Sequence, residues 1–250
     1  LKLARPGTEP AALDMQEALL RHLAARDTGL QLPRPVATLQ GAFTFEDTSF
    51  DGLPRLVRLM HWVPGRVYAA VRPHDDVLLE SLGDQLGRLS RALQGFDHPA
   101  AHRWIKWDPA QAGWTADKLH YLADEGRRSI AGHFLELFQR EAAPRLSGLR
   151  CGVNYNDAND YNILVGQAGE QSVVTGFIDF GDAVYTPLIN ELAIALAYAL
   201  MDQPDPLAAA VPVVRAYHRT FPLREEELAA LFPLIGARLL LSVVHSAINR

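Results

Sequence analysis

The sequence has a single cysteine, Cys151, among its 250 residues. One cysteine cannot form an intramolecular disulfide, and it excludes a cysteine-rich zinc site. A chain of this length needs neither kind of covalent or metal crosslink, because it can bury about 75% of the surface that its unfolded form exposes. A lone thiol agrees with a reducing compartment, and we expect a cytoplasmic protein.

The chain also has no excess of positive charge and no long hydrophobic run. Its formal net charge is −5, so we expect no broad basic surface for nucleic acid. The most apolar stretches are 188–201, which contains Asn190 and Glu191, and 239–244, which is too short to cross a bilayer. No secretory signal opens the chain. We therefore expect no nucleic-acid partner and no membrane partner.

The composition is that of a globular protein, with 48% hydrophobic and 21% charged residues, and it fits one large domain or two small lobes. The first residue is Leu1 rather than Met, and it stands in the apolar run 1–4. We therefore expect a fragment whose first residues continue a strand.

Strand patterns dominate the first part of the chain and helical patterns dominate the rest. Before the break at 63–66, the pattern predicts a helix over 10–25 and strands over 43–45 and 56–62. This divides the chain into a partial N-lobe, 1–62, and a helical C-lobe, 63–250. In the C-lobe we predict helices over 77–93, 115–122, 129–138, 188–201, 207–220, 225–232 and 239–248, with strands over 162–165 and 173–179.

The most unusual stretch, 154–162, packs amides and carboxylates into a loop before an apolar strand. A second acid, Asp179, ends a later apolar strand. If these strands pair as an antiparallel hairpin, Asn162 lies opposite Asp179, and Asp157 lies in the loop just before. Oxygen ligands of this kind suit Mg²⁺, which keeps waters and bridges phosphate oxygens. The alternative is an Asx-rich turn whose side chains cap their own backbone.

The two stretches resemble the motifs of the aminoglycoside phosphotransferase/choline kinase family. Asp157-x4-Asn162 and Asp179-Phe180-Gly181 are similar to the family's His-x-Asp-x4-Asn and Ile-Asp-Phe/Trp-Gly. The resemblance implies that Asp157 is the catalytic aspartate, Asn162 a metal ligand and Asp179 the principal metal ligand. It also implies an α+β fold of the protein-kinase-like kind, with a small β-sheet N-lobe and a large helical C-lobe.

The same resemblance implies a nucleotide site. Lys2 resembles the strand lysine that grips the nucleotide phosphates, and 58–65 resembles the hinge that holds the base through backbone hydrogen bonds, at His61 and Val63. The implied cofactors are Mg²⁺ and ATP or GTP as phosphoryl donor. The family's glycine-rich hairpin over the phosphates would precede Leu1, so we expect N-lobe strands beyond this sequence.

Three positions depart from the family pattern. Tyr155 stands where a histidine usually precedes the catalytic Asp157, and we expect it to face inward and brace the loop. Gln16 stands where a helix glutamate normally pairs with the lysine, so it would hydrogen-bond Lys2 without neutralising it. Glu191 occupies the place of a structural aspartate.

The resemblance implies a small-molecule kinase that phosphorylates the hydroxyl of an amine or amino acid, by positioning and charge neutralisation. Asp157 should face the open cleft, where an acceptor hydroxyl reaches it. Acidic residues there favour a cationic acceptor; hydroxylysine-like compounds, ethanolamine derivatives, choline, homoserine and aminoglycosides stay open.

The motif sequences are most similar to those of the hydroxylysine-kinase-like branch of the family. That branch includes domains fused to class III aminotransferases, so we also expect such a fusion in the full-length protein.

A different class of function also stays open, a weak or inactive kinase-like regulatory or docking domain of a larger protein. Tyr155, Gln16 and the absent glycine-rich hairpin motivate it. A protein-directed kinase is a third and weaker alternative, because too few residues follow Asp179 before the next helix to form a peptide platform.

The aromatic and basic segment 103–108 either lines an acceptor pocket or packs between helices. We expect Trp104 to pack, and we keep Trp107 and Asp108 as pocket candidates. His245 lies on an apolar helix face and is expected to be a core residue.

Overall fold

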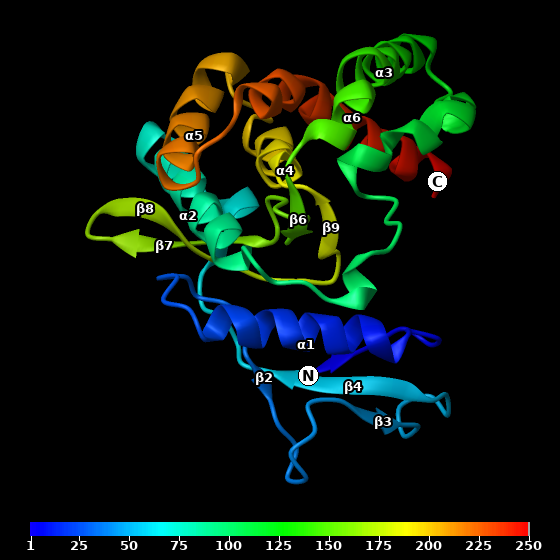
Figure 1. Cartoon of the computed structure of the whole chain (residues 1–250), viewed down its shortest axis with the longest axis vertical. Coiled ribbons are helices and arrows are strands. Elements are labelled where there is room, and N and C mark those ends of the chain that lie inside the picture. Colours follow the sequence, from blue (N-terminus) through cyan, green and yellow to red (C-terminus); the bar gives the residue numbers. More distant parts are fainter. Residues whose placement is uncertain (250) are drawn as a thin grey trace.

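The computed structural model describes residues 1–249, and its two parts lie on either side of one long helix (Figure 1). The strands are β1 (Lys2–Leu3), β2 (Pro35–Val36), β3 (Phe45–Asp47), β4 (Arg55–Met60), β5 (Arg66–Val67), β6 (Cys151–Asn154), β7 (Ile163–Ala168), β8 (Gln171–Phe177) and β9 (Val184–Pro187). The α-helices are α1 (Pro10–Ala24), α2 (Asp76–Leu93), α3 (Glu125–Leu137), α4 (Ile189–Ala199), α5 (Pro206–Thr220) and α6 (Glu225–Ile248). Short 3₁₀ and π turns occupy Tyr68–Ala70, Pro99–Ala101, Pro109–Tyr121, Phe138–Ala142 and Ala143–Gly148.

Strand β4 is the centre of the N-terminal sheet, which has the antiparallel order β1-β4-β2, with β3 also paired to β4. Lys2 lies directly opposite Arg58 in the β1–β4 register, so both side chains leave the same face of the sheet. Helix α1 runs between this sheet and the helical part (Figure 1). Its residues Met15, Leu19 and Leu23 recur every four positions and are buried, which is the spacing of one helix face.

Helices α2 and α5 pack unusually closely in the helical part. Asp75 caps α2 by accepting a hydrogen bond from the backbone N–H of Leu78 at 2.9 Å. A Cβ at Gly83 would lie 2.1 Å from the carbonyl oxygen of Val213 in α5, so only glycine allows this approach. Helix α4 is buried along almost all of its length, and its sequence is apolar apart from Asn190 and Glu191 in its first turn.

Helix α6 runs unbroken from Glu225 to Ile248, with Pro233 inside. The sequence prediction of two separate helices, 225–232 and 239–248, is therefore wrong. A proline removes one helical hydrogen bond. The helix continues because Leu231 and Leu234, on either side of that position, are buried. By length and composition alone, α6 is the one helix among residues 1–249 that could cross a membrane. Its buried leucines identify it as a core helix.

The hairpin β7–β8 forms as predicted, but its register differs by one residue. Ile163 pairs with Phe177, and the register shifts between Leu164 and Val165. Strand β5 adds a third strand beside β7, and β6 pairs with β9 to form a separate two-stranded sheet. The sequence prediction contains neither β2, β5, β6 nor β9, because strands of two to four residues carry almost no periodic signal.

The segment after α1 contacts the hairpin through its backbone. Gln31 N–H donates to the carbonyl oxygen of Thr175 at 2.9 Å, and Phe177 N–H donates to the carbonyl oxygen of Gln31 at 3.3 Å. A Cβ at Gly176 would lie 2.0 Å from that Gln31 oxygen. Glycine is therefore required at 176 for the N-terminal part to meet the hairpin.

Candidate active site

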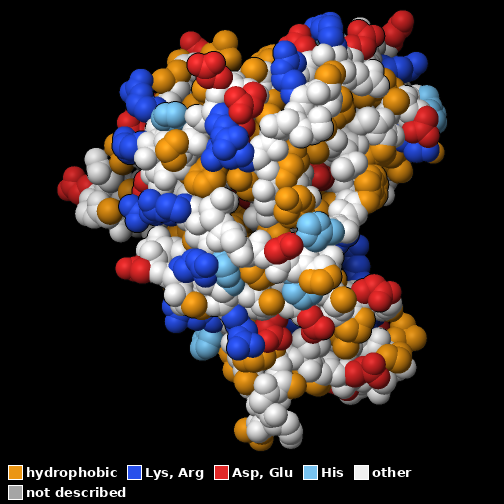
Figure 2. All heavy atoms as spheres, viewed as in Figure 1, with side chains coloured by type: hydrophobic (Ala, Val, Ile, Leu, Met, Phe, Trp, Pro, Cys, Tyr) orange, Lys and Arg blue, Asp and Glu red, His pale blue; other side chains and the backbone are white. Residues whose placement is uncertain are grey.

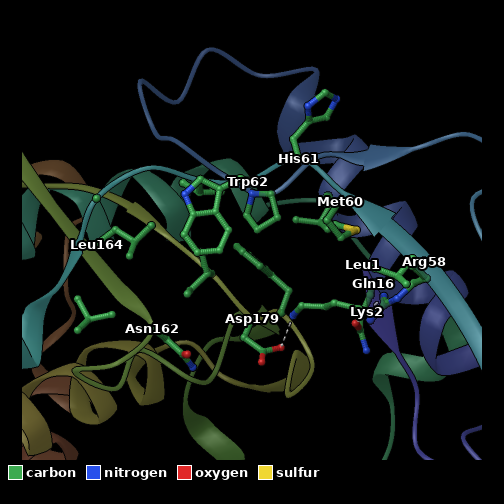
Figure 3. Close-up of a pocket in the computed structure, with 17 residues that line it drawn as sticks. Leu1, Lys2, Gln16, Arg58, Met60, His61, Trp62, Asn162, Leu164 and Asp179 are labelled. Carbon is green, nitrogen blue, oxygen red and sulfur yellow. Dashed lines mark hydrogen bonds and ion pairs between the residues drawn. The ribbon is translucent and has the colours of Figure 1, made fainter. Parts of the chain in front are cut away.

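A cavity of about 560 Å³ opens between the N-terminal sheet and the β7–β8 hairpin (Figure 3). It is lined by residues from β1, α1, the end of β4 and the hairpin. The polar members are Lys2, Gln16, Arg58, His61, Asn162 and Asp179. Apolar walls with a few convergent charged groups are typical of a ligand site.

Lys2 and Asp179 meet inside this cavity. Lys2 Nζ lies 3.4 Å from Asp179 Oδ1 (Figure 3), so Lys2 points toward the cleft as the sequence predicts. Both side chains are about half exposed, and an ion pair in that setting contributes little stability. Asp179 also has φ of 61°, a left-handed backbone that costs energy in a non-glycine residue and that clusters at functional sites.

Gln16 does not pair with Lys2, which corrects the sequence prediction. Its Oε1 instead accepts a hydrogen bond from Arg58 Nη1 at 2.9 Å. Burial lowers the pKa of Arg58, and the nearby charge of Asp179 opposes that shift. The sequence analysis placed Arg58 in the hinge-like segment 58–65 but predicted no role for its side chain, although Arg58 and Met60 alternate along β4 toward the cavity while Leu59 is exposed.

The segment after β4 offers backbone groups to the cavity. His61 N–H is occupied, because it donates to the carbonyl oxygen of Arg34 at 2.9 Å. Within residues 1–249 the carbonyl of His61 and the N–H of Val63 have no hydrogen-bond partner. A free acceptor and a free donor two residues apart, at the rim of the cavity, suit the edge of a planar base.

Asn162 and Asp179 present oxygens to the same cavity. Ile178 N–H donates to the backbone oxygen of Asn162 at 2.9 Å, which joins the two loops despite the altered register. Asn162 Nδ2 donates to Asp157 Oδ2 at 2.7 Å, and this orientation leaves Asn162 Oδ1 as an acceptor.

The donor set fits a hard cation. No cluster of three or more His, Cys, Asp or Glu side chains with metal-binding geometry occurs in residues 1–249. Asn162 and Asp179 together offer an amide oxygen and a carboxylate. Mg²⁺ is commonly held by one or two carboxylates and completed by phosphate oxygens and water, so these two residues fit such an ion when a nucleotide is present.

Asp157 is largely buried, which corrects the prediction that it faces open cleft space. Its side chain is 18% exposed, and its Oδ1 lies 3.0 Å from Arg238 Nη2. Asn159 Nδ2 also donates to Oδ1 at 3.0 Å. Burial raises the pKa of Asp157 to about 6, and the Arg238 charge limits the rise. The cause of the burial is α6, whose buried guanidinium needs a counter-ion.

Arg238 is the second residue that the sequence prediction missed. Its Nε donates to Tyr198 Oη at 3.1 Å, and its Nη1 donates to the carbonyl oxygen of Trp107 at 2.7 Å. The guanidinium also lies over the rings of Trp107 and Tyr198, at 5.3 and 5.4 Å from their centroids. A single charge inside an otherwise apolar helical run is a signal that was available, because such a residue is seldom buried without a partner.

The loop that carries Asp157 is braced from below. Tyr155 is fully buried, its hydroxyl donates to the carbonyl oxygen of Ile178, and its ring lies 4.5 Å from that of Phe180. Its inward orientation is confirmed. Glu191 accepts a hydrogen bond from Asn156 N–H at 3.1 Å, and burial raises the pKa of Glu191 to about 7. This bond holds the left-handed backbone of Asn156, whose φ is 64°.

A second cleft, of about 800 Å³, lies on the other side of the Asp179 loop and is lined by residues 103–107, Arg5, Asp182 and the end of α6. Trp104 lines it and is 61% exposed, so the expectation that it packs is wrong. His245 also lines this cleft, so the expectation that it is a core residue is wrong.

Trp107 lines the second cleft as expected, but Asp108 does not. Asp108 is buried, and its carboxylate accepts hydrogen bonds from Thr186 Oγ1 and Asn190 Nδ2. These bonds tie the 103–108 segment to β9 and α4. Asp108 is therefore a structural residue.

Comparisons with known proteins agree with this geometry. The model of the phosphotransferase enzyme family matches residues 1–230. The hydroxylysine kinase of Danio rerio is 28% identical over 241 residues, which cover 94% of this chain and 67% of that protein. The hydroxylysine kinase of Bos taurus is 31% identical over 203 residues, which cover 77% of this chain and 53% of that protein. The chain thus spans between about half and two thirds of the length of these relatives.

Solved structures show the same fold. An amicoumacin kinase in complex with AMP-PNP, Ca²⁺ and Ami superposes with a TM-score of 0.69 at 18% identity, over 97% of this chain and 72% of that one. The GDP complex of aminoglycoside 2'-phosphotransferase-IIIa gives a TM-score of 0.61 at 18% identity, over 96% and 76%. The α+β fold of the protein-kinase-like kind is therefore confirmed. Nothing in these comparisons bears on a fusion to an aminotransferase.

Proposed function

The chain belongs to the phosphotransferase enzyme family, and from this premise we propose that it transfers the γ-phosphoryl group of ATP or GTP to the hydroxyl group of a small amine or amino acid. The observation that carries the proposal is the convergence of Lys2, Asn162 and Asp179 on one cavity, with Asp157 hydrogen-bonded to Asn162. Phosphoryl transfer depends almost entirely on positioning and charge neutralisation, and these groups supply both.

The nucleotide would occupy the 560 Å³ cavity. The free carbonyl of His61 and the free N–H of Val63 would bind the edge of the base. Lys2 would bind phosphate oxygens in exchange for its weak ion pair with Asp179. The two related structures are complexes with AMP-PNP and Ca²⁺ and with GDP, which supports a nucleotide and a divalent ion here.

Asn162 and Asp179 would hold Mg²⁺. When bound, such an ion would supply positive charge that stabilises the transferred phosphoryl group. Asp157 would orient the acceptor hydroxyl and accept its proton late in the transfer. Arg238 fixes the Asp157 carboxylate through Oδ1, and Asn162 holds Oδ2. The residue is thus restrained from both sides before the acceptor arrives.

A phosphotransfer screen tests the proposal. ATP and GTP are crossed with hydroxylysine, ethanolamine, choline, homoserine and an aminoglycoside, with and without Mg²⁺. Hydroxylysine is the first choice because the relatives above are hydroxylysine kinases. We expect Mg²⁺-dependent turnover of at least one acceptor, which Asp179→Ala abolishes. The absence of turnover with every acceptor would count against the proposal.

The second candidate is a kinase-like regulatory or docking domain that binds nucleotide without turnover. One observation favours it: Lys2 has no partner on α1, because Gln16 is engaged by Arg58. The same screen, combined with a direct measurement of nucleotide binding, separates the two. Nucleotide binding without transfer to any acceptor would favour the regulatory function.

A further inference from the structure

The second cleft contains more positive than negative charge. Arg5, Arg103 and Lys106 line it, and Asp182 is the one carboxylate among its lining residues. None of the three cations forms an ion pair with another residue of the described chain, 1–249. Arg5 and Lys106 are exposed to water, whereas Arg103 is half-buried, so Arg103 is the cation whose charge is costly without a compensating group.

Arg103 is fixed in place rather than mobile. Its Nη2 donates to the carbonyl oxygens of Gly181 at 2.7 Å and Ala183 at 3.1 Å. These two residues flank Asp182, so the guanidinium is attached to the loop that follows the metal-binding motif. Its Nε is buried and has no hydrogen-bond partner. Burial lowers the pKa of Arg103, and the charge of Asp182 opposes that shift.

Lys106 is held at the opposite wall of the cleft. Its Nζ lies 3.2 Å from His245 Nε2 of α6 and 5.8 Å from the centroid of the Trp107 ring. Burial, followed by the charge of Lys106, lowers the pKa of His245. Lys106 thus contacts an imidazole rather than a carboxylate, and no carboxylate of residues 1–249 forms an ion pair with it.

The cleft is connected to the residues proposed for the chemistry. Trp107 packs under Arg238, which pairs with Asp157. Asp182 is three residues beyond Asp179, which lines the other cavity. The cleft and the nucleotide cavity thus lie on two sides of one loop, and the outline of the molecule narrows between its two parts (Figure 2).

We propose that Arg103 and Lys106 bind a carboxylate group of the acceptor, while Asp182 binds its amino group. The inference rests on the proposed function and names the substrate class of that site: a zwitterionic hydroxy amino acid rather than a plain amine. Arg103 Nη2 is engaged by the two carbonyl oxygens and Nε is buried, so Nη1 is the group of Arg103 that can donate to a carboxylate, beside the positive charge of Lys106. A purely cationic acceptor is disfavoured, because three cations face it. The exposed Trp104 offers an apolar wall to the aliphatic part of the molecule.

The test compares two acceptors that differ only in the carboxylate, 5-hydroxylysine and its decarboxylated counterpart, with the full chain and the variant Lys106→Met. We expect Lys106→Met to lower kcat/KM for hydroxylysine by roughly 10-fold to 100-fold, the usual effect of losing a hydrogen bond to a charged group. It should change kcat/KM for the decarboxylated compound little. Lys118→Met is the matched control, because Lys118 pairs with Asp117 and lines neither cavity.

Arg103→Lys is the second variant, since it keeps the positive charge and loses the Nη1 donor. It also loses the hydrogen bonds to Gly181 and Ala183, so its readout is the comparison of the two acceptors: kcat/KM should fall more for hydroxylysine than for the decarboxylated compound. An equal loss for both acceptors in both variants would overturn the carboxylate site. A raised KM for the nucleotide with an unchanged KM for the acceptor in Lys106→Met would assign the cations to phosphate binding instead.

Calorimetric titration of both compounds, in the presence of AMP-PNP and Mg²⁺, separates this inference from the proposed function. Tighter binding of hydroxylysine than of its decarboxylated counterpart, with the difference lost in Lys106→Met, supports the carboxylate site even without turnover. Equal binding of both compounds to the unmodified chain overturns it, whether or not phosphate is transferred.

Discussion

Arg238 and Asp157 form an ion pair of 3.0 Å in which the arginine side chain is only 3% exposed. Helix α6 thereby reaches across the C-lobe to the loop of the proposed catalytic residue. The pair couples two roles of Asp157, since the same carboxylate that would meet the acceptor hydroxyl also neutralises a buried cation. Removing one member leaves the other charge buried without compensation.

This coupling makes Asp157→Asn a test with two readouts. Asparagine keeps the size and hydrogen bonding of the side chain but removes the proton-accepting charge. We expect turnover to fall by roughly 10²-fold to 10⁴-fold, with near-normal nucleotide affinity. We also expect a stability loss of about 3–5 kcal/mol, because Arg238 loses its counter-ion. Steady-state phosphotransfer and denaturant unfolding measure the two effects.

Arg238→Met in the Asp157→Asn background is the control for that variant. It removes the uncompensated cation, so stability should recover while turnover stays low. Unchanged turnover in Asp157→Asn would remove this residue from the mechanism.

Asp179→Ala should abolish Mg²⁺-dependent nucleotide binding and leave the fold intact. The carboxylate is more than half exposed and its ion pair with Lys2 is long, so its removal costs little stability. Calorimetry with AMP-PNP and Mg²⁺, together with thermal unfolding, measures both quantities. Asp117→Ala is the matched control, because it removes another surface ion pair, with Lys118. Full Mg²⁺-dependent binding in Asp179→Ala would be incompatible with a metal site at this residue.

Gln16→Glu tests whether the side chain at position 16 of α1 contacts Arg58 or Lys2. The new carboxylate would meet Arg58, which already donates to Gln16 at 2.9 Å, rather than Lys2. We therefore expect unchanged turnover and a changed melting temperature. A large gain in turnover would show instead that the new glutamate pairs with Lys2, and that the hydrogen bond between Arg58 and residue 16 is broken during turnover.

Glu191 should make stability depend on pH. Burial raises its pKa from 4.5 to about 7 in the folded chain, so between these values the folded state binds more protons than the unfolded state. Stability is then fully present below pH 4.5 and is lost as pH rises toward about 7. Denaturant unfolding at several pH values should show this decline, up to roughly 3 kcal/mol.

Glu191→Gln is the control for this pH dependence. The amide keeps an oxygen for the N–H of Asn156 and does not titrate, so the decline that is due to residue 191 should disappear. An identical slope in the variant would mean that other groups cause it.

The local motifs of this chain were predictable from the sequence, and the distant contacts were not. The strand–loop–strand pattern around Asn162 and Asp179 has short sequence separation, so its hairpin could be predicted without a partner elsewhere. Arg238 and Asp157 are 81 positions apart, and no local pattern relates them. The exposure of Asp157 was mispredicted for this reason, because it depends on a side chain supplied by α6.

Segment 103–108 shows the same limit of prediction from sequence. Its aromatic and basic residues predicted a pocket wall or a packing surface, but not which residue takes which role. Asp108 is directed inward by Thr186 and Asn190, and the neighbouring Trp104 is consequently left at the surface. The partners that decide this lie about 80 positions further along the chain.

The close contact of Gly176 with Gln31 gives the two parts of the molecule a connection besides the chain that follows β4. Helix α1 supplies another, because His22 Nε2 lies 3.0 Å from the carbonyl oxygen of Ala92 in α2. An alanine at 176 would push Gln31 away and would loosen the attachment of the segment after α1 to the hairpin. The contact of α1 with α2 would remain, so the floor of the nucleotide cavity would become less rigid without the two parts separating.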